Sequence, residues 1–563
     1  MEAGRWMDRA WIIGWGILSS IWCLTASGQI GATFDEPHYL KHGLHAWRSG
    51  SYHQLLRAGT MPLPTDVEYL PVYIVEQVRD RPFDIEREYV LVQRIARAGN
   101  LAFWWLLLYF SWRLGRRFGG PWAGRLAVVF VACEPNLLAH ACLATTDIAI
   151  SACLAMFAEA YLAGRDKTWR GRVGLPALCF GMALLAKVSA LAFAGIIIGA
   201  VELHRLWSLP FFLSPRSLGP ITWMRQLWRE TVAFRRETFQ IFFLGFAWVF
   251  LYCGSDWRTE PGFIRMANGL PEGLWRTIML FVAENLKIFP NAGQGIFYQI
   301  AHNFRGHGVF VMGNWFPRAV WYYFPVALTM KLTLPVMLLL AGLLITRPRS
   351  FAHPLGLIVA ILFLFTFNCR VQIGIRLILP FVSFLMIGLA VAFVRAWPEH
   401  RPRWSFHAGV TALAAIMMVP MMLAWPHGLC WFNRLWGGPD EGYRYLSDSN
   451  YDWGQGLDDL TRWREEHGQP RMKMWYYGSD PRARQHETNV FFAHINLKSA
   501  EEFNQIVKGH YVAVGTTIMH SNPTPSPSGE IALSVLKTKK PIARTMTFFI
   551  YDFTEPTHMA AVP

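Results

Sequence analysis

The chain has 563 residues, of which 53% are apolar and only 16% charged, and its mean hydropathy is +0.23. Soluble proteins carry about a quarter charged residues, so these values exclude a disordered, collagen-like or disulfide-scaffold protein and indicate a polytopic membrane protein. The net charge is +15, but many cations lie between apolar runs, where membrane topology explains them without a nucleic-acid partner. The eight cysteines contain no CxxC pair, which argues against a zinc site or a disulfide framework.

Apolar runs long enough to cross a bilayer as helices recur along the first three quarters of the chain. The stretch 172–203 is interrupted at Lys187 and Ser189, and we interpret it as two short spans. Counted in this way, the sequence predicts about eleven transmembrane helices, near 10–28, 98–114, 122–139, 147–164, 172–187, 189–203, 237–254, 319–345, 351–367, 376–396 and 405–425.

The distribution of cations between these spans predicts the orientation. With a cytoplasmic N-terminus, the short outside connections hold only Lys187, Arg370 and Arg376. Arg and Lys are instead concentrated in the inside segments, near 113–125, 165–172, 205–236, 347–349 and 395–403. By the positive-inside rule, we expect a multi-pass protein of the cell inner (plasma) membrane with a cytoplasmic N-terminus and an extracytoplasmic C-terminal part.

Residues 1–427 therefore form a predicted transmembrane domain with two long outer loops, 29–97 and 255–318. The first loop has helical patterns near 36–48 and 85–97. The second contains an amphipathic stretch, Leu274–Phe289, that could lie on the membrane surface.

Residues 428–563 are predicted to form a small extracytoplasmic α/β domain. A helix is expected over Asp458–His467, and a capping box, Ser499–Glu502, opens another. Alternating patterns predict strands over Met472–Tyr477, Tyr511–Thr516 and Thr547–Phe553, and the segment 521–529 has the composition of a turn-rich loop.

Acidic residues stand at the outer boundary of two predicted spans, where charge is costly and therefore informative. Asp35 and Glu36 follow the first span together with His38 and could supply a general base or a metal ligand. The alternative is a helix N-terminus before Pro37. Asp147 begins a later span near His140 and could cap it, although capping does not explain why Glu134, Asn136 and His140 crowd the same edge.

Three cations, Lys187, Lys331 and Arg376, lie on or near the same outer side. Snorkelling toward lipid headgroups would explain any one of them. Three cations together with acids also suit a different task, in which cations hold a lipid phosphate while a carboxylate activates a hydroxyl. Transfer of a sugar from a polyprenyl phosphate needs this combination, because the departing phosphate must be neutralised and the acceptor must lose a proton.

The chain also resembles the GT-C membrane glycosyltransferases, and most closely the branch containing protein O-mannosyltransferases and the lipid A aminoarabinose transferase, within a bacterial mannosyltransferase-like subgroup. The resemblance extends to about residue 480. It rests on the order and placement of six segments: Phe34–His38, Pro135–Asp147, Leu185–Ala190, Trp321–Lys331, Ile373–Arg376 and Asp448–Gln455.

This resemblance implies that Asp35 is the general base, with Glu36 supporting it or binding the acceptor. Asp147 would orient the donor sugar or the acceptor. The donor phosphate would contact Lys187, Lys331 and Arg376. Further residues that could line the site are His38, His140, Asp448, Asn450 and Asp452. The segment Asp448–Gln455 could equally stabilise the domain junction through Asx turns.

Two departures from the family pattern affect this transfer of roles. The chain has Met61–Glu68 where relatives carry His-Pro-Pro-Leu, and Leu377 follows Arg376 where many have histidine. Both changes could alter the donor or the acceptor. We assign no metal and no certain cofactor, and a divalent cation stays open as an alternative.

The leading hypothesis is thus a glycosyltransferase that uses a polyprenyl-phosphate sugar as donor and a protein or glycolipid as acceptor. A lipid or solute transporter would place charges near the bilayer midplane and show internal repeats, whereas most candidate charges here lie at one face. A non-catalytic subunit of a membrane assembly would keep the fold without the chemistry. Neither the sugar nor the acceptor is specified by the sequence.

Overall fold

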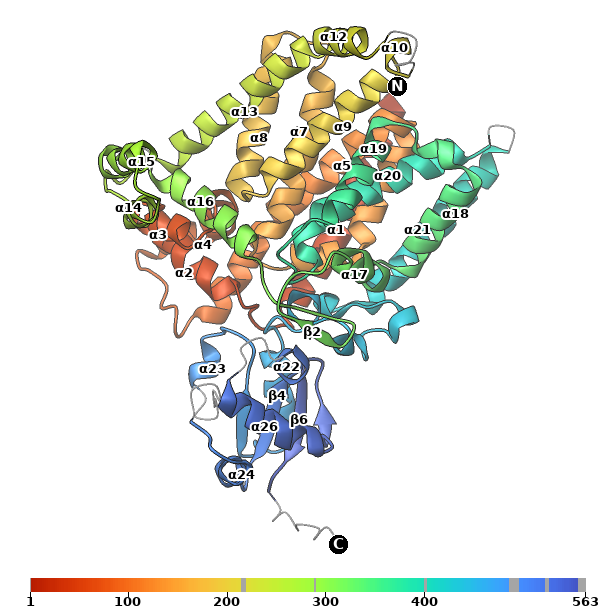
Figure 1. Cartoon of the computed structure of the whole chain (residues 1–563). Helices are drawn as coiled ribbons and strands as arrows, with labels where there is room; N and C mark the ends of the chain where they lie inside the picture. Colours follow the sequence, from red (N-terminus) through yellow and green to blue (C-terminus); the bar gives the residue numbers. More distant parts are fainter. Residues whose placement is uncertain are drawn as a thin grey trace.

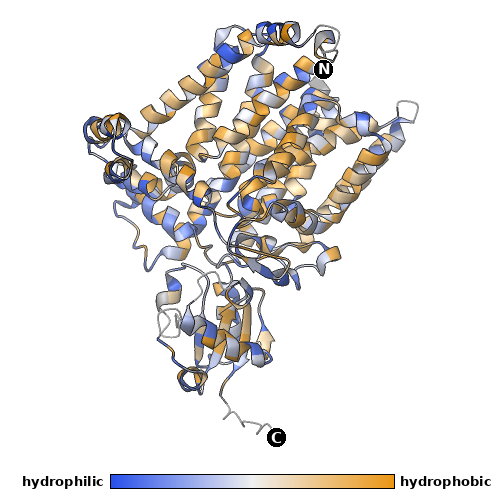
Figure 2. Ribbon diagram, viewed as in Figure 1, coloured by the Kyte–Doolittle hydropathy of each residue, from blue (hydrophilic) through white to orange (hydrophobic). Residues whose placement is uncertain are grey.

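Long helices form most of the molecule, and a small α/β unit extends from one end of them (Figure 1). The computed structural model describes residues 2–213, 219–287, 290–398, 402–485, 496–521 and 526–554. Figure 2 shows that hydrophobic residues run along the helices, whereas the α/β unit is mixed. The architecture is therefore that of a polytopic α-helical protein with a small C-terminal α/β unit, as the sequence predicts.

Five described helices are long and apolar enough to cross a membrane by length and composition, or seven spans if each of two bent pairs counts as one. The five are α1 (Glu2–Ser27), α7 (Thr146–Gly164), α9 (Ala190–Trp207), α20 (Leu379–Ala396) with the preceding turn η3 (Ile375–Ile378), and α21 (Arg403–Leu423). The predicted spans 237–254 and 351–367 correspond to α13 (Val232–Cys253) and the 13-residue α19 (Pro354–Thr366).

The predicted spans 98–114 and 122–139 lie on two arms of α5 (Tyr89–Cys133). The chain reverses at Gly120, where φ is 78°. A Cβ on Gly124 would lie 2.8 Å from the carbonyl oxygen of Trp112, so the two arms pack side by side. The second arm ends at Glu134 and continues as α6 (Pro135–Ala141) after a bend of 67°, so the predicted span 122–139 is a broken helix.

Two further helix breaks lie beside Lys187 and Lys331, two of the predicted phosphate-binding cations. The stretch 172–203 forms two helices as predicted, α8 (Leu175–Ala186) and α9, with Lys187 between them. The span expected over 319–345 is not one continuous helix, because α17 (Tyr323–Lys331) and α18 (Leu334–Thr346) meet at 114°. Pro335 stands in the first turn of α18, and it has no N–H to continue the hydrogen bonds of the preceding helix.

The helices differ in how much of their surface is covered. Almost all of α7 and α20 is buried, whereas α1 and α21 are largely exposed. The exposed residues of the peripheral helices are apolar, for example Phe239, Leu338 and Val419. Such a surface suits contact with lipid rather than water.

The two ends of the helical layer are distinct. The N-terminus and α12 (Pro220–Glu230) lie at the end opposite the α/β unit (Figure 1). Several arginines of the cation-rich segments pair there with buried acids, at 2.7–3.1 Å for Arg125–Asp8, Arg117–Glu159 and Arg172–Glu237. These cations therefore also neutralise acids at the ends of neighbouring helices.

Both predicted outer loops contain helices. The loop 29–97 holds α2 (Glu36–Ser49), as predicted, then α3 (His53–Arg57) and α4 (Pro62–Arg79), whereas the helix expected over 85–97 begins only at Tyr89. The loop 255–318 holds α14 (Pro261–Asn268), α15 (Leu274–Asn285), α16 (Pro290–Arg305) and a hairpin of β1 (Val309–Val311) and β2 (Asn314–Phe316).

The α/β unit contains a four-stranded sheet in the order β3-β4-β6-β5. Its strands are β3 (Met472–Trp475), β4 (Tyr511–Gly515), β5 (Ala543–Arg544) and β6 (Phe548–Asp552), and its helices are α22 (Leu457–Glu466), α23 (Arg482–Gln485), α24 (Ala500–Val507), α25 (Thr516–Ser521) and α26 (Pro527–Thr538). Only β3 and β4 are parallel. Ser499 caps α24 as predicted. Of the loop expected at 521–529, residues 522–525 lie outside the described residues, and α26 already begins at Pro527.

Candidate active site

The candidate site lies where the segment after α1, the start of α7, the α8–α9 break and η3 meet. Asp35 is the N-cap residue of α2, but its carboxylate makes no capping bond to the described residues of that helix. Its Oδ2 instead accepts a hydrogen bond of 2.8 Å from Nη1 of Arg376. The Asp35 side chain is 25% exposed, so its carboxylate pairs with Arg376 and stays partly accessible instead of capping α2.

Asp147 joins the two cations behind Asp35. It lies in the first turn of α7 with no exposed surface. Its Oδ1 accepts a 2.7 Å hydrogen bond from Nζ of Lys187, and its Oδ2 lies 3.8 Å from Nη1 of Arg376 and 3.7 Å from Nδ1 of His140. Two acids and two cations thus alternate, and each charge has an opposite charge beside it, as burial requires.

Trp453 closes one side of this cluster. Its ring lies 4.1 Å from the guanidinium carbon of Arg376 and 6.1 Å from the ring of His140. Tyr39, one turn after Asp35, donates from its hydroxyl to Asp35 Oδ2 at 3.5 Å. These aromatic side chains leave Asp35 as the more accessible acid of the cluster.

The segment Asp448–Trp453, here called the strap, holds η3 in place. The side-chain oxygen of Asn450 accepts the N–H of Ile375 at 3.0 Å, and its amide donates to the hydroxyl of Tyr323 at 2.8 Å. Ser449 donates from its hydroxyl to the carbonyl of Ile373. A Cβ on Gly374 would collide with the Ser449 hydroxyl oxygen, at 2.0 Å, so the close approach requires glycine before η3.

Lys331, predicted as a phosphate ligand, is not brought into the cluster. It is almost fully buried, and its Nζ donates to the backbone carbonyls of Leu429 and Asn450 at 2.8 and 2.7 Å. Its ammonium therefore ties the end of α17 to the strap, and its contacts are those of a positioning residue.

Asp448 and Asp452 attach the strap to the α/β unit. Asp448 accepts a 2.6 Å hydrogen bond from the hydroxyl of Tyr477, and burial raises its pKa. Asp452 accepts the N–H of Thr517 at 3.1 Å, and burial raises its pKa to about 7. These contacts agree with the alternative in which this segment stabilises the domain junction.

Glu36 is buried beneath the site and does not face the cluster's open side. Both of its oxygens accept from Arg97, at 2.7 Å each, and Oε2 also accepts the N–H of Thr33 at 2.9 Å. Burial alone would raise the pKa of Glu36, but the Arg97 charge and these hydrogen bonds outweigh it and lower the pKa. The pair fixes the segment that carries Asp35.

His38 lies on α2 with its ring 4.4 Å from that of His42, and burial lowers its pKa. Its backbone N–H donates to the carbonyl of Asp35 at 3.1 Å, but its imidazole makes no hydrogen bond with a described residue of the cluster. Among the described residues, no group of three or more His, Cys, Asp or Glu side chains is arranged to hold a metal ion.

Two acids of α4, Asp66 and Glu68, were not predicted as site residues from the sequence. Both lie in Met61–Glu68, the segment in which the chain differs from the family pattern. Asp66 accepts hydrogen bonds from the hydroxyls of Tyr52 and Tyr252 at 2.8 and 2.6 Å, and burial raises its pKa to about 6. Glu68 is fully buried, and neither carboxyl oxygen has a hydrogen-bond partner in the described part of the chain. Burial, with Glu36 and Asp147 nearby, raises its pKa well above normal.

No protein-family model matches the sequence, and no curated protein gives a significant sequence match. Solved structures do match over most of the chain. ArnT from Cupriavidus metallidurans, solved bound to undecaprenyl phosphate, has a TM-score of 0.45 and 13% identity, with 96% of this chain and 97% of that chain covered. The oligosaccharyltransferase from Archaeoglobus fulgidus in its apo form has a TM-score of 0.45 and 11% identity, covering 91% of this chain and 70% of that one.

The archaeal oligosaccharyltransferase AglB from Archaeoglobus fulgidus, in complex with an inhibitory peptide and a dolichol-phosphate, has a TM-score of 0.43 and 11% identity, with 98% of this chain and 76% of that chain covered. ArnT, an aminoarabinose transferase, and AglB are both GT-C superfamily members.

Proposed function

We propose that the chain is a membrane glycosyltransferase that moves a sugar from a polyprenyl-phosphate-linked donor to an acceptor hydroxyl, with Asp35 as general base. One observation carries this proposal. Asp35 is a partly exposed carboxylate that pairs with the buried cation Arg376, while Glu36 and Asp147 are buried and Lys187, which pairs with Asp147, is 16% exposed. A base next to cations is the arrangement that the transfer needs.

In the proposed reaction, the acceptor oxygen attacks the anomeric carbon of the donor sugar and forms the new C–O bond. Asp35 takes the proton of the acceptor hydroxyl. The bond between the anomeric carbon and the phosphate oxygen breaks, and its electron pair leaves with the polyprenyl phosphate. Arg376 and Lys187 stabilise the charge that develops there, since cations placed before the reaction need no reorganisation. A single displacement inverts the anomeric configuration.

Asp147 has a positioning role in this scheme. It is fully buried and contacts both Lys187 and Arg376, so it fixes the distance between the two cations. The strap and Lys331 fix η3 and thereby the Arg376 guanidinium. Lys331 is therefore given this positioning role in place of a contact with the phosphate.

The site is proposed to face away from the cytoplasm. It lies toward the same end of the helical layer as the α/β unit, opposite the N-terminus (Figure 1), and the cation-rich segments of the other end favour a cytoplasmic location for that end. An outward site suits a lipid-linked donor. The acceptor, a protein or a glycolipid, is left unassigned.

The proposal can be tested with the purified full chain in nanodiscs, a panel of radiolabelled polyprenyl-phosphate sugars and a membrane extract as acceptor source. Wild type should release free polyprenyl phosphate from one donor, and Asp35→Asn should not. Asp440→Asn is a matched control, because Asp440 is an exposed acid whose only described ion pair is with Arg544. Release at equal rates by wild type and Asp35→Asn would contradict the role of Asp35, and folded wild type that releases nothing would favour a non-catalytic subunit.

A further inference from the structure

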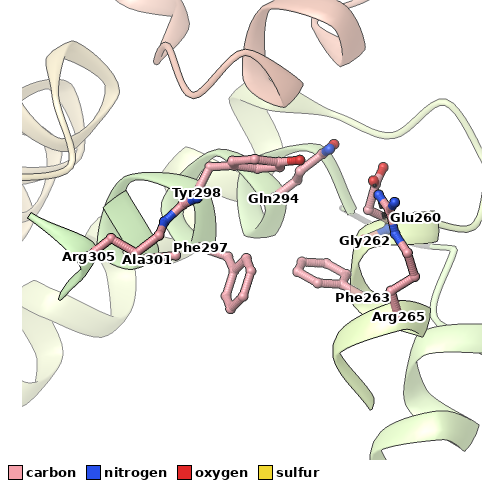
Figure 3. A pocket seen from close by; sticks show the side chains of 9 residues that line it. All are labelled: Glu260, Gly262, Phe263, Arg265, Gln294, Phe297, Tyr298, Ala301 and Arg305. Atoms are coloured by element: carbon pink, nitrogen blue, oxygen red, sulfur yellow. Dashed lines mark hydrogen bonds between the residues drawn. The ribbon is translucent and has the colours of Figure 1, made fainter. Parts of the chain in front are cut away.

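A cavity of about 170 Å³ lies between α14 and α16, outside the candidate active site. Figure 3 shows its lining: Phe263 and Phe297 face each other on one side, Gln294 and Tyr298 lie opposite them, and Arg265 and Arg305 stand at its two ends. The two phenyl rings are 5.9 Å apart in an edge-to-face arrangement. The cavity thus combines an apolar floor with polar and cationic groups.

The amide of Gln294 points to a missing partner. Gln294 is 1% exposed, and neither its nitrogen nor its oxygen has a hydrogen-bond partner among the described residues. Leaving such a group unsatisfied costs about 1–3 kcal/mol. A bound molecule with hydroxyl or ester oxygens would satisfy it.

The charges of the lining select the kind of molecule. Neither Arg265 nor Arg305 forms an ion pair with any residue that the structure describes. Two free guanidinium groups favour a phosphate. Glu260 also lines the cavity; it is buried and accepts the N–H of Gly262 at 3.2 Å. Its carboxylate opposes a bare anion, but it can accept hydrogen bonds from hydroxyl groups beside the phosphate.

The neighbouring helix indicates where such a molecule comes from. α15 packs against α14 and exposes a series of large apolar side chains, Leu274, Trp275, Ile278 and Phe281. α14 and α15 lie together at the margin of the helical layer (Figure 1). An amphipathic helix that exposes Trp, Phe and Leu is typical of a membrane interface, which favours a lipid headgroup as the occupant of the neighbouring cavity.

We propose that this cavity binds the headgroup of an acidic phospholipid that carries hydroxyls as well as phosphate, such as phosphatidylglycerol. Arg265 and Arg305 pair with the phosphate, Glu260 and Gln294 bind the hydroxyls, and Phe263 and Phe297 pack against the glycerol carbons. Basic pockets at the membrane surface bind headgroups by this chemistry. The proposal does not depend on glycosyl transfer.

Native mass spectrometry of the full chain tests it, with phosphatidylglycerol, phosphatidic acid, phosphatidylcholine, undecaprenyl phosphate and inorganic phosphate offered separately. Wild type should retain phosphatidylglycerol best. The double variant Arg265→Gln/Arg305→Gln should retain about a hundredfold less of it, equivalent to the loss of two charge-assisted contacts at about tenfold each. Arg276→Gln on α15 is the matched control, because Arg276 already pairs with Glu272, and it should bind normally.

Three results would overturn the assignment. Equal retention of phosphatidylglycerol by wild type and the double variant would refute the proposal that Arg265 and Arg305 bind the headgroup. Phosphatidic acid or inorganic phosphate held as well as phosphatidylglycerol would refute the role of the hydroxyls, and so would retention of undecaprenyl phosphate that is lost in Arg265→Gln/Arg305→Gln. Gln294→Leu should lose the lipid; if it instead retains the lipid and unfolds at a higher temperature, the cavity is only a packing defect.

Discussion

Replacing Asn450 by alanine would release η3 from the strap. Two buried groups lose their partners: the N–H of Ile375, 3.0 Å from the Asn450 oxygen, and the hydroxyl of Tyr323, 2.8 Å from the Asn450 nitrogen. The carbonyl of Asn450 still accepts from Lys331. Each unsatisfied buried group costs about 1–3 kcal/mol, so the variant should lose about 2–6 kcal/mol of stability.

The expected functional effect is larger than the loss of stability suggests. Ile375 immediately precedes Arg376, and a displacement of about 1 Å at a catalytic group can reduce a rate by about 100-fold. Asn450→Ala should therefore slow polyprenyl phosphate release by about that factor while the protein remains folded. Tyr323→Phe is the matched control, because it removes one hydrogen bond of Asn450 and leaves the bond to Ile375 intact.

Hydrogen exchange measures the release of η3 directly, and it does not require that the sugar donor be known. The amide of Ile375 should exchange faster in Asn450→Ala than in wild type, and Tyr323→Phe should retain its protection. Unchanged protection of residues 375–378 in Asn450→Ala would refute the reasoning. So would equal rates of release by the two variants, because the effect would then not pass through η3.

Three further predictions concern the buried Arg97–Glu36 pair, the buried acid Asp66 and the Trp453 ring beside Arg376. Arg97→Met leaves Glu36 buried and unpaired and should cost about 3–5 kcal/mol, seen as a lower unfolding temperature; a double variant that also carries Glu36→Gln should recover part of it. Burial raises the pKa of Asp66 to about 6, so the folded chain binds a proton there that the unfolded chain releases near pH 4; this group lowers stability as pH rises from about 4 to 6, and thermal unfolding of Asp66→Asn should show a shallower slope over that range than wild type. Trp453→Leu removes the ring beside Arg376, a contact worth about 1–2 kcal/mol, and should slow release by about tenfold; an unchanged rate would exclude that contact from the mechanism.

Hydropathy and turn chemistry predicted most of the helices, because long apolar runs in a membrane protein have few alternatives to helix. The split of 172–203 at Lys187 was visible as a charge in an apolar run. The bend between α17 and α18 was not, since 319–345 reads as one continuous run, and Pro335 is as compatible with a kink as with a new helix. The helix α4 was missed because three prolines stand within Pro62–Arg79.

The acids and cations of the candidate site were predicted from their position at one membrane boundary, and the structure places Asp35, Asp147, Lys187 and Arg376 together. The strap could not be derived in the same way. Whether Asn450 faces a substrate or the N–H of Ile375 depends on packing between segments 75 residues apart, and local pattern carries no information on that pairing. Lys331 illustrates the same limit, because a charge near a boundary reads alike whether it binds a phosphate or two carbonyl groups.

The central claim is that Asp35 removes the acceptor proton, and its most direct test is the rate of polyprenyl phosphate release by wild type, Asp35→Asn and Asp35→Glu with the same donor and acceptor. We expect Asp35→Asn to lower the rate by about 10²–10⁴-fold, the usual contribution of a general base, without loss of donor binding. Asp35→Glu keeps a carboxylate and should restore part of the rate. Release by Asp35→Asn at the wild-type rate would contradict the claim.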